Sequence, residues 1–284
     1  MTDVEPPADV VREAVTRALA EDLGPEGDVT GALLDPDVRA HADVVARAPG
    51  IVAGTACFTE TYRQLDGAVC VQWNAHDGSR VERGAVLGTV DGASRSVLTG
   101  ERTALNFLCH LSGVATLTRR FVDGAAGRLA IMDTRKTLPG LRALEKAAVR
   151  AGGGVNHRMS LSDMVLVKDN HLAGVGVFEA VRRARDLWPE HRVEVECDRL
   201  EQVEAAVEAG ADIVMLDNMT VEQARACVAY VRAGARPETQ IEISGGVTLE
   251  TIDAYAATGA DSCSTSAITQ SAPALDIALD VAIT

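Results

Sequence analysis

The chain has 284 residues, a formal net charge of −14 at pH 7 and a composition that is 47% hydrophobic. This length exceeds that of an average single domain, so a barrel-sized domain with a smaller companion is expected. The negative charge argues against nonspecific nucleic-acid binding, which requires a basic face. No apolar run approaches the ~20 residues of a membrane span, and residues 1–10 carry three acidic side chains and no basic one, so a cytoplasmic location is expected.

The first part of the chain predicts one helix, several strands and then a long helix. Apolar residues recur at helical spacing over 9–22 and stop at Gly24-Pro25, which predicts the first helix. Strand-like segments follow at 41–48, 69–74 and 85–90. An apolar pattern at a spacing of about 3.6 over 96–125 predicts one long helix, or two joined at Ser112-Gly113, at a junction between domains.

After residue 127 short apolar runs alternate with helical segments, which is the pattern of repeated βα units. The runs lie at 129–132, 164–167, 193–195, 213–216 and 240–243, with a weaker one at 260–264. Helices are predicted between them at 141–151, 177–187, 200–209, 221–231 and 249–258. Six such units are fewer than the roughly eight of a complete barrel, so the sequence predicts an open or irregular α/β barrel.

Polar or charged residues end each of these apolar runs. They are residues 133–136, 168–170, Glu196, Asp217-Asn218, 244–246 and 264–266. Because the carboxyl ends of barrel strands meet at one mouth, we expect these side chains to face one another. A single residue of this kind is more often a helix cap or a solvated turn residue, but a series in register favours a functional site.

A basic cluster is the most informative part of this series. Arg135 and Lys136 follow one strand, His157 and Arg158 lie in the next loop, and Lys168 follows the next strand. Groups of one sign that share a mouth repel each other unless a multiply charged anion joins them. Arginine grips carboxylates through two hydrogen bonds, so a carboxylate-bearing ligand is favoured.

Two other groups of residues in the series allow two interpretations each. Glu196 and Asp217 either form ion pairs with the basic cluster or bind sugar hydroxyls and a Mg²⁺ ion carried in by a diphosphate. Ser244-Gly245-Gly246 either ends a strand or presents backbone N–H groups and a helix N-terminus to a phosphate.

Longer stretches of the chain carry a resemblance to a known family. They are residues 101–106 with 111–113, 133–145 (DTRKTLPGLRALE), 152–158 (GGGVNHR), 168–171 (KDNH) and 244–246, with Glu21-Asp22 and 27–30 near the start. Together they resemble quinolinate phosphoribosyltransferases, also called carboxylating nicotinate-nucleotide pyrophosphorylases. The resemblance implies an N-terminal α/β sandwich domain over 1–112 and an open α/β barrel with the active site over 113–268. It also implies a C-terminal helix over 269–284 that packs back toward the N-terminal domain.

The resemblance implies a pentosyltransferase of NAD biosynthesis. Phosphoribose passes from phosphoribosyl pyrophosphate to the ring nitrogen of quinolinate (pyridine-2,3-dicarboxylate) with Mg²⁺, and the 2-carboxylate leaves as CO₂. The products are nicotinate mononucleotide and pyrophosphate. A homodimer, or a hexamer of dimers, is also implied, in which Arg102 reaches the active site of the neighbouring subunit.

Most of the family's functional residues fall on positions already singled out above. The resemblance implies that the two carboxylates are held by Arg102, Arg135, His157, Arg158 and Lys168, and that the pyrophosphate is met by Lys136. It implies that the ribose hydroxyls and Mg²⁺ are met by Glu196 and Asp217. The 5-phosphate is expected to be held by Ser244, Gly245, Gly246, Thr265, Ser266 and Ala267. Thr137 completes the expected substrate-binding set. Lys136, Lys168, Glu196 and Asp217 are the expected catalytic residues.

Two positions depart from the family pattern. The last phosphate loop reads Ser264-Thr265-Ser266 where a glycine is usual, and Gln270 stands near a common histidine position. Three alternatives therefore stay open: a sister phosphoribosyltransferase for a different aromatic acid, a Schiff-base lyase that uses Lys168 as nucleophile, and a noncatalytic binding protein.

Overall fold

The computed structural model describes residues 4–168, 170 and 174–283, which form two compact units. The first unit comprises Met1–Arg119, Thr137–Gly153 and Ile268–Thr284, and the second comprises Arg120–Lys136 and Gly154–Ala267. In the described part of the chain, no helix combines the length and the apolar character that a bilayer span requires.

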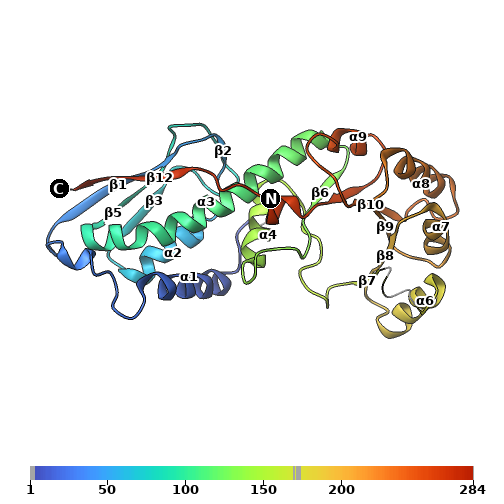
Figure 1. Ribbon diagram of the computed structural model, residues 1–284, viewed down its shortest axis with the longest axis horizontal. Coiled ribbons are helices and arrows are strands. Elements are labelled where there is room, and N and C mark those ends of the chain that lie inside the picture. Colours follow the sequence, from blue (N-terminus) through green and yellow to red (C-terminus); the bar gives the residue numbers. More distant parts are fainter. Residues whose placement is uncertain (1–3, 169, 171–173, 284) are drawn as a thin grey trace. The chain divides into compact units, whose positions relative to one another are not determined.

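An antiparallel sheet covered by helices on one face builds the first unit (Figure 1). Its strand order is β12-β1-β5-β3, formed by β1 (Arg39–Ala46), β3 (Cys70–Trp73), β5 (Val86–Ala93) and β12 (Ile277–Ile283). The covering helices are α1 (Ala8–Leu23), α2 (Thr55–Leu65) and the first part of α3 (Ser94–Ala125); the small elements η1 (Gly31–Leu33), β2 (Gly50–Ile51) and β4 (Arg80–Val81) complete the unit's first segment. Phe58 and Tyr62 of α2 are fully buried in one core with Leu87 and Val90 of β5. This two-layer arrangement confirms the predicted α/β sandwich.

The long helix α3 runs without a break through residues 94–125. Of the two arrangements allowed by the sequence, the single helix is therefore the one observed. Gly113 serves packing: a Cβ there would lie 2.2 Å from the backbone oxygen of Pro273, so only glycine lets the segment before β12 pass so close to the helix.

The prediction of a C-terminal helix over 269–284 is wrong. The helix α10 (Ala267–Gln270) has only 4 residues, and the following segment forms β12, which pairs antiparallel with β1. The register runs from Ala46 opposite Ile277 to Ala40 opposite Ile283. The cause is visible in the alternation of Ile277, Leu279, Val281 and Ile283, because a period of two with β-branched residues suits a strand. The segment does pack with the first unit, as expected.

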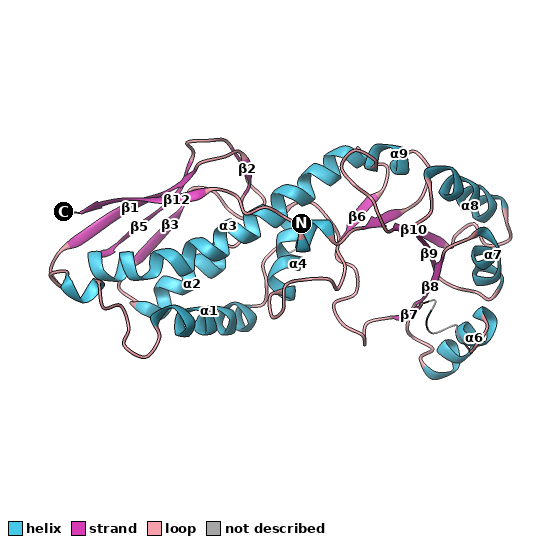
Figure 2. Ribbon diagram, in the orientation of Figure 1, coloured by secondary structure: helices cyan, strands magenta, loops and turns pink. Residues whose placement is uncertain are grey.

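Six parallel strands form the sheet of the second unit, in the order β6-β11-β10-β9-β8-β7 (Figure 2). They are β6 (Ala130–Met132), β7 (Val165–Val167), β8 (Val193–Cys197), β9 (Ile213–Asp217), β10 (Gln240–Ser244) and β11 (Ser262–Ser264), and the alternating helices are α6 (Val177–Leu187), α7 (Leu200–Glu208), α8 (Val221–Ala233) and α9 (Ile252–Ala256). β6 and β7 stand at the two ends of the strand order, so the predicted open barrel is confirmed.

Helix α4 (Arg142–Ala151) follows β6 in sequence but belongs to the first unit. The buried carboxylate of Glu145 lies 2.9 Å from Nε2 of His110 on α3, and a Cβ at Gly152 would come 2.4 Å from the backbone oxygen of Ala115. The compact units therefore do not divide at residues 112 and 113, because α3 continues through that point and α4 packs against it.

Candidate active site

Alternate residues of the barrel strands line the interior of the second unit. On β9 these are Ile213, Met215 and Asp217, and on β10 they are Gln240, Glu242 and Ser244. Successive side chains of a strand point to opposite faces, so residues two apart share one face. The last interior position of each strand therefore faces the carboxyl-end mouth.

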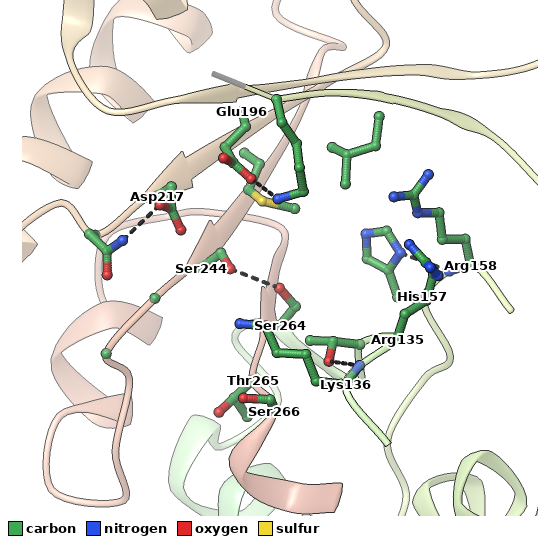
Figure 3. Close-up of a pocket in the computed structure, with 17 residues that line it drawn as sticks. Arg135, Lys136, His157, Arg158, Glu196, Asp217, Ser244, Ser264, Thr265 and Ser266 are labelled. Atoms are coloured by element: carbon green, nitrogen blue, oxygen red, sulfur yellow. Dashed lines mark hydrogen bonds and ion pairs between the residues drawn. The ribbon is translucent and has the colours of Figure 1, made fainter. Parts of the chain in front are cut away.

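At this mouth the strands surround a pocket of about 460 Å³ (Figure 3). Its lining residues are Thr134, Arg135, Lys136, His157, Arg158, Leu166, Lys168, Glu196, Met215, Asp217, Asn218, Ser244, Gly245, Gly246, Ser264, Thr265 and Ser266. The expected convergence of strand ends is thus observed. Figure 3 shows Arg135, His157 and Arg158 along one side of the pocket and Glu196, Asp217 and Ser244 along the other.

Positive charge dominates one side of the pocket. The backbone N–H of Lys136 donates to Thr134 Oγ1 (2.9 Å), which fixes the turn after β6, and Arg158 Nη1 donates to the Met164 carbonyl (3.3 Å). Burial lowers the pKa of Arg158 and the positive charge of Arg135 lowers it further. Two arginines that oppose each other's charge in this way favour a bound anion, which would relieve the repulsion.

Buried Asp133 holds the loop that carries His157 and Arg158. Its carboxylate accepts hydrogen bonds from Asn156 Nδ2 (2.5 Å) and from the His157 backbone N–H (2.9 Å). Val155 adds a parallel bridge to Met132 at the end of β6. The two basic segments of the pocket are therefore joined to each other before any ligand binds.

The acidic side of the pocket contains an ion pair and a hydrogen-bonded carboxylate. Lys168 Nζ binds Glu196 Oε2, which links the ends of β7 and β8. Asp217 Oδ2 accepts a hydrogen bond from Asn218 Nδ2 (2.7 Å), and Asn218 adopts a left-handed backbone with φ of 55°. Lys168 thus contacts an acidic neighbour, whereas the resemblance assigned it to a substrate carboxylate.

Ser244, Gly245 and Gly246 form a tight loop after β10. Gly245 has φ of 82°, and a Cβ on it would lie 2.3 Å from Asn218 Oδ1, so the position requires glycine. Gly246 has φ of 65°, and a Cβ on it would meet no atom within 4 Å. Ser264 Oγ donates to Ser244 Oγ (3.3 Å), which joins the loop to β11. The loop exposes backbone where a phosphate can approach.

Three expected site residues are not among those that line the pocket. Arg102 is exposed on the part of α3 that belongs to the first unit, and Thr137 Oγ1 accepts a hydrogen bond from Arg142 Nε (3.2 Å) in the same unit. The Ala267 backbone N–H donates to Thr265 Oγ1 (3.3 Å). Asp169 and His171 of the KDNH stretch lie outside the described residues.

The sequence reasoning missed four interior residues. Leu166 and Met215 line the pocket, and Glu194 and Glu242 lie below it with 0% and 1% exposure. Each stands two residues before a predicted site residue: Lys168, Asp217, Glu196 and Ser244. Strand alternation was the signal that could have revealed all four, because it places both members of each pair on one face.

Comparisons with known proteins agree over nearly the whole chain. Residues 28–112 match the family described as quinolinate phosphoribosyl transferase, N-terminal domain, and residues 114–280 match its C-terminal domain. A nicotinate-nucleotide pyrophosphorylase [carboxylating] of Mycobacterium leprae is 44% identical over 96% of this chain and 98% of its own length. The solved nicotinate-nucleotide pyrophosphorylase of Francisella tularensis superposes with a TM-score of 0.92 at 38% identity, covering 98% of both chains. That of Ehrlichia chaffeensis gives 0.90 at 34% identity, covering 95% of this chain and 98% of its own.

Proposed function

Because the chain belongs to the quinolinate phosphoribosyltransferase family, we propose that it transfers phosphoribose from phosphoribosyl pyrophosphate to quinolinate and releases CO₂ and pyrophosphate. The observation that carries the proposal is the pocket itself, in which arginines oppose carboxylates across a mouth lined by bare glycine backbone. The product is nicotinate mononucleotide, a precursor of NAD.

The arginine side binds the dicarboxylate ring. Arg135 and Arg158 supply planar donors that match carboxylates, and their mutual repulsion is relieved when the anion enters. Leu166 and Met215 give the pocket an apolar surface on which the flat ring can pack. Lys168 lines the same pocket and completes the set that we assign to the acid, whereas His157 supports the backbone of Arg158.

The acidic side binds the sugar and its metal. Mg²⁺ binds proteins through one or two carboxylates, keeps several waters and takes substrate phosphates as further ligands. Asp217 meets this description, and Glu196 offers its second oxygen while Lys168 holds Oε2. These residues therefore fit a metal that arrives with the diphosphate, and Mg²⁺ would neutralise charge on the leaving pyrophosphate.

The glycine loop binds the 5-phosphate. Gly245 and Gly246 bring backbone close to the pocket, and Thr265 and Ser266 add hydroxyl donors. Ser266 faces the pocket where the family usually has glycine, so we assign it a hydrogen bond to the phosphate.

The chain's own groups act mainly through charge and position. Lys136 extends across the pocket toward Ser264 in Figure 3, where it can stabilise the negative charge that accumulates on pyrophosphate as the sugar becomes cationic. After transfer, the quaternised ring nitrogen stabilises the carbanion left by CO₂, so decarboxylation requires no dedicated base. Arg135 and Arg158 then have only to hold the ring in place.

We further propose that Arg102 of one subunit completes the pocket of another, in a homodimer or a hexamer of dimers in the cytoplasm. Its exposed position on α3 is compatible with contact to a second chain. Light scattering of the purified protein tests the assembly, and a monomer that is fully active would contradict it.

One experiment separates the proposed reaction from its alternatives. Purified protein is mixed with Mg²⁺, phosphoribosyl pyrophosphate and quinolinate labelled in the 2-carboxylate, and labelled CO₂ and nicotinate mononucleotide are measured. Both products should appear in equal amounts. An Arg128→Ala variant is a suitable control, because Arg128 pairs with exposed Asp253 and does not line the pocket.

Two results would favour the alternatives. Turnover of a different aromatic acid, without labelled CO₂, would indicate the sister phosphoribosyltransferase. Borohydride trapping of a substrate on Lys168 would indicate the lyase. The ion pair of Lys168 with Glu196 argues against it, because it already occupies the amine that would have to attack the substrate.

A further inference from the structure

A second cavity of about 250 Å³ lies in the barrel interior below the active-site pocket. Its lining includes the first interior residues of the strands, among them Ala130, Ile213 and Gln240. His157 and Arg158 line both cavities. They therefore form part of the floor that separates the pocket from the lower end of the barrel.

Three titratable groups meet at this floor. His157 Nε2 lies 3.2 Å from Glu194 Oε2 and 3.5 Å from Glu242 Oε2, and one polar atom of each residue lies within 4.8 Å of the others. The His157 side chain is 8% exposed and the two carboxyl groups are essentially buried. Burial of two neighbouring negative charges is costly, so two buried carboxyl groups this close together require a proton or a cation between them.

The hydrogen bonds of His157 define its tautomer. Nδ1 accepts the backbone N–H of Arg158 (2.7 Å), so the ring proton resides on Nε2. Nε2 faces the carboxyl groups of Glu194 and Glu242, so both ring nitrogens face groups of the protein itself. This differs from the role that the resemblance assigned to His157, which was to bind a substrate carboxylate directly.

The carboxyl oxygens show where a second proton belongs. Both oxygens of Glu194 and Oε1 of Glu242 are buried and have no hydrogen bond to another described residue. A proton on Glu242 would satisfy its own group by donating to Glu194. The cluster would then carry one negative charge, located below the two arginines of the pocket.

We infer that Glu194 and a protonated Glu242 are positioning residues: they fix the His157 ring, and its Nδ1 in turn fixes the backbone of Arg158, which faces the acid substrate. The inference rests on the proposed function. His157 links the two parts: its Nε2 faces the buried carboxyl groups, and its Nδ1 accepts the backbone N–H of Arg158 on the arginine side of the pocket.

The electrostatics of Glu242 support this assignment. Its pKa is raised to about 8, mainly by burial and then by the charge of Glu194, while His157 acts in the opposite direction. A hydrogen bond with Ser264 on β11 also lowers the pKa, whereas Asp133 beside β6 raises it. Glu242 is therefore mostly protonated at neutral pH.

Other charged groups near Glu242 lie on the lower side. Arg192 and Asp261 line the second cavity with it, and the buried thiol of Cys263 on β11 has a pKa raised to about 12, mainly by burial and then by Glu242. Cys263 is therefore neutral across the working pH range.

These charges give the direction of the expected change in KM. Above pH 8, Glu242 gains a negative charge below Arg158 and repels the dianionic acid, so KM for quinolinate rises.

The test is the pH dependence of KM for quinolinate. In the wild-type protein KM should rise about tenfold between roughly pH 7 and pH 9, since the protonated fraction of a group with a pKa of about 8 falls by that factor. Glu242→Gln keeps the shape and removes the charge, so its KM should change less than about twofold over this range. Glu238→Gln, the same change at an exposed carboxylate, should keep the wild-type dependence.

Two measurements keep the inference testable if Glu242→Gln does not fold. Nitrogen-15 NMR of histidine-labelled wild-type protein at about pH 7 should show His157 as the neutral Nε2–H tautomer, identified by loss of its signals in His157→Asn. An imidazolium, or the Nδ1–H tautomer, would overturn the inference. So would a metal ion bound in equal amount to the wild-type protein and lost with Glu194→Gln, because a metal would replace the proton.

These outcomes are distinct from failure of the proposed reaction. If the wild-type protein does not convert quinolinate, the proposed function fails, while the NMR measurement still decides the state of His157. If conversion occurs but the KM of Glu242→Gln rises with pH as in the wild type, the positioning role of Glu242 fails alone.

Discussion

Replacement of Gly245 by alanine tests how tightly the phosphate loop is built. Gly245 has φ of 82°, which costs about 1–2 kcal/mol for a residue with a Cβ. The added Cβ would also lie 2.3 Å from Asn218 Oδ1 and 2.9 Å from its backbone nitrogen. Asn218 is held there because its N–H donates to the Ser244 carbonyl (2.9 Å) and its Nδ2 donates to Asp217 (2.7 Å).

The cost of the substitution therefore has two parts. The first is backbone strain. The second is the displacement of Asn218 by the added Cβ, and overpacking of this kind typically destabilises a protein by about 1–3 kcal/mol. We expect Gly245→Ala to lower the free energy of unfolding by about 2–5 kcal/mol. Because Asn218 is hydrogen-bonded to Asp217, KM for phosphoribosyl pyrophosphate should rise by about tenfold or more, which corresponds to about 1.4 kcal/mol.

Two glycines provide matched controls. Gly127 has φ of 71° and a Cβ there would meet no atom within 4 Å, so Gly127→Ala should show backbone strain alone and unchanged kinetics. A Cβ at Gly246 would also meet no atom within 4 Å, but this residue lines the pocket. Gly246→Ala should therefore combine a small loss of stability with a raised KM for phosphoribosyl pyrophosphate. Calorimetric unfolding and steady-state kinetics of the three variants give the comparison. A Gly245→Ala protein as stable as Gly127→Ala would refute the reasoning.

Three further predictions concern binding, assembly and the sheet. Arg135→Ala should lower kcat/KM for quinolinate by roughly 10²–10³, the scale for loss of one preorganised charged donor, and near-normal kinetics would contradict its role. Mixing Arg102→Ala with Arg135→Ala chains should restore part of the lost activity, because one pocket of a heterodimer would then carry both arginines; verified heterodimers without recovery would argue against sharing. Leu279→Ala should destabilise the protein by about 2–3 kcal/mol in denaturant unfolding, since this side chain is 9% exposed in β12 opposite Val44; no loss would show that the strand is not packed as described.

Periodicity was sufficient to predict most of the secondary structure. The helix expected at 177–187 is α6 with the same bounds, and the strand expected at 213–216 is β9 with one residue added. The helix expected at 269–284 came from the resemblance, and it is wrong although the sequence alternates from Ile277 onward. Pairing with β1 decides that segment, and such a distant partner is not visible in local sequence.

The sequence predicted which charged residues lie at the strand ends, but it did not predict which of them pair with each other. Arg135, Arg158 and Asp217 could be placed at one mouth because parallel strands share a direction. The pairing of Lys168 with Glu196 depends on β7 and β8 being neighbours, which the sequence does not state.

The position of β12 has a consequence for synthesis of the chain. The outer partner of β1 lies more than 230 residues downstream, beyond every strand of the barrel. While a ribosome is still making the barrel, one edge of the first sheet has its N–H and C=O groups exposed. That edge is the place where a chaperone, or an unwanted second nascent chain, would bind before residues 277–283 emerge and cover it.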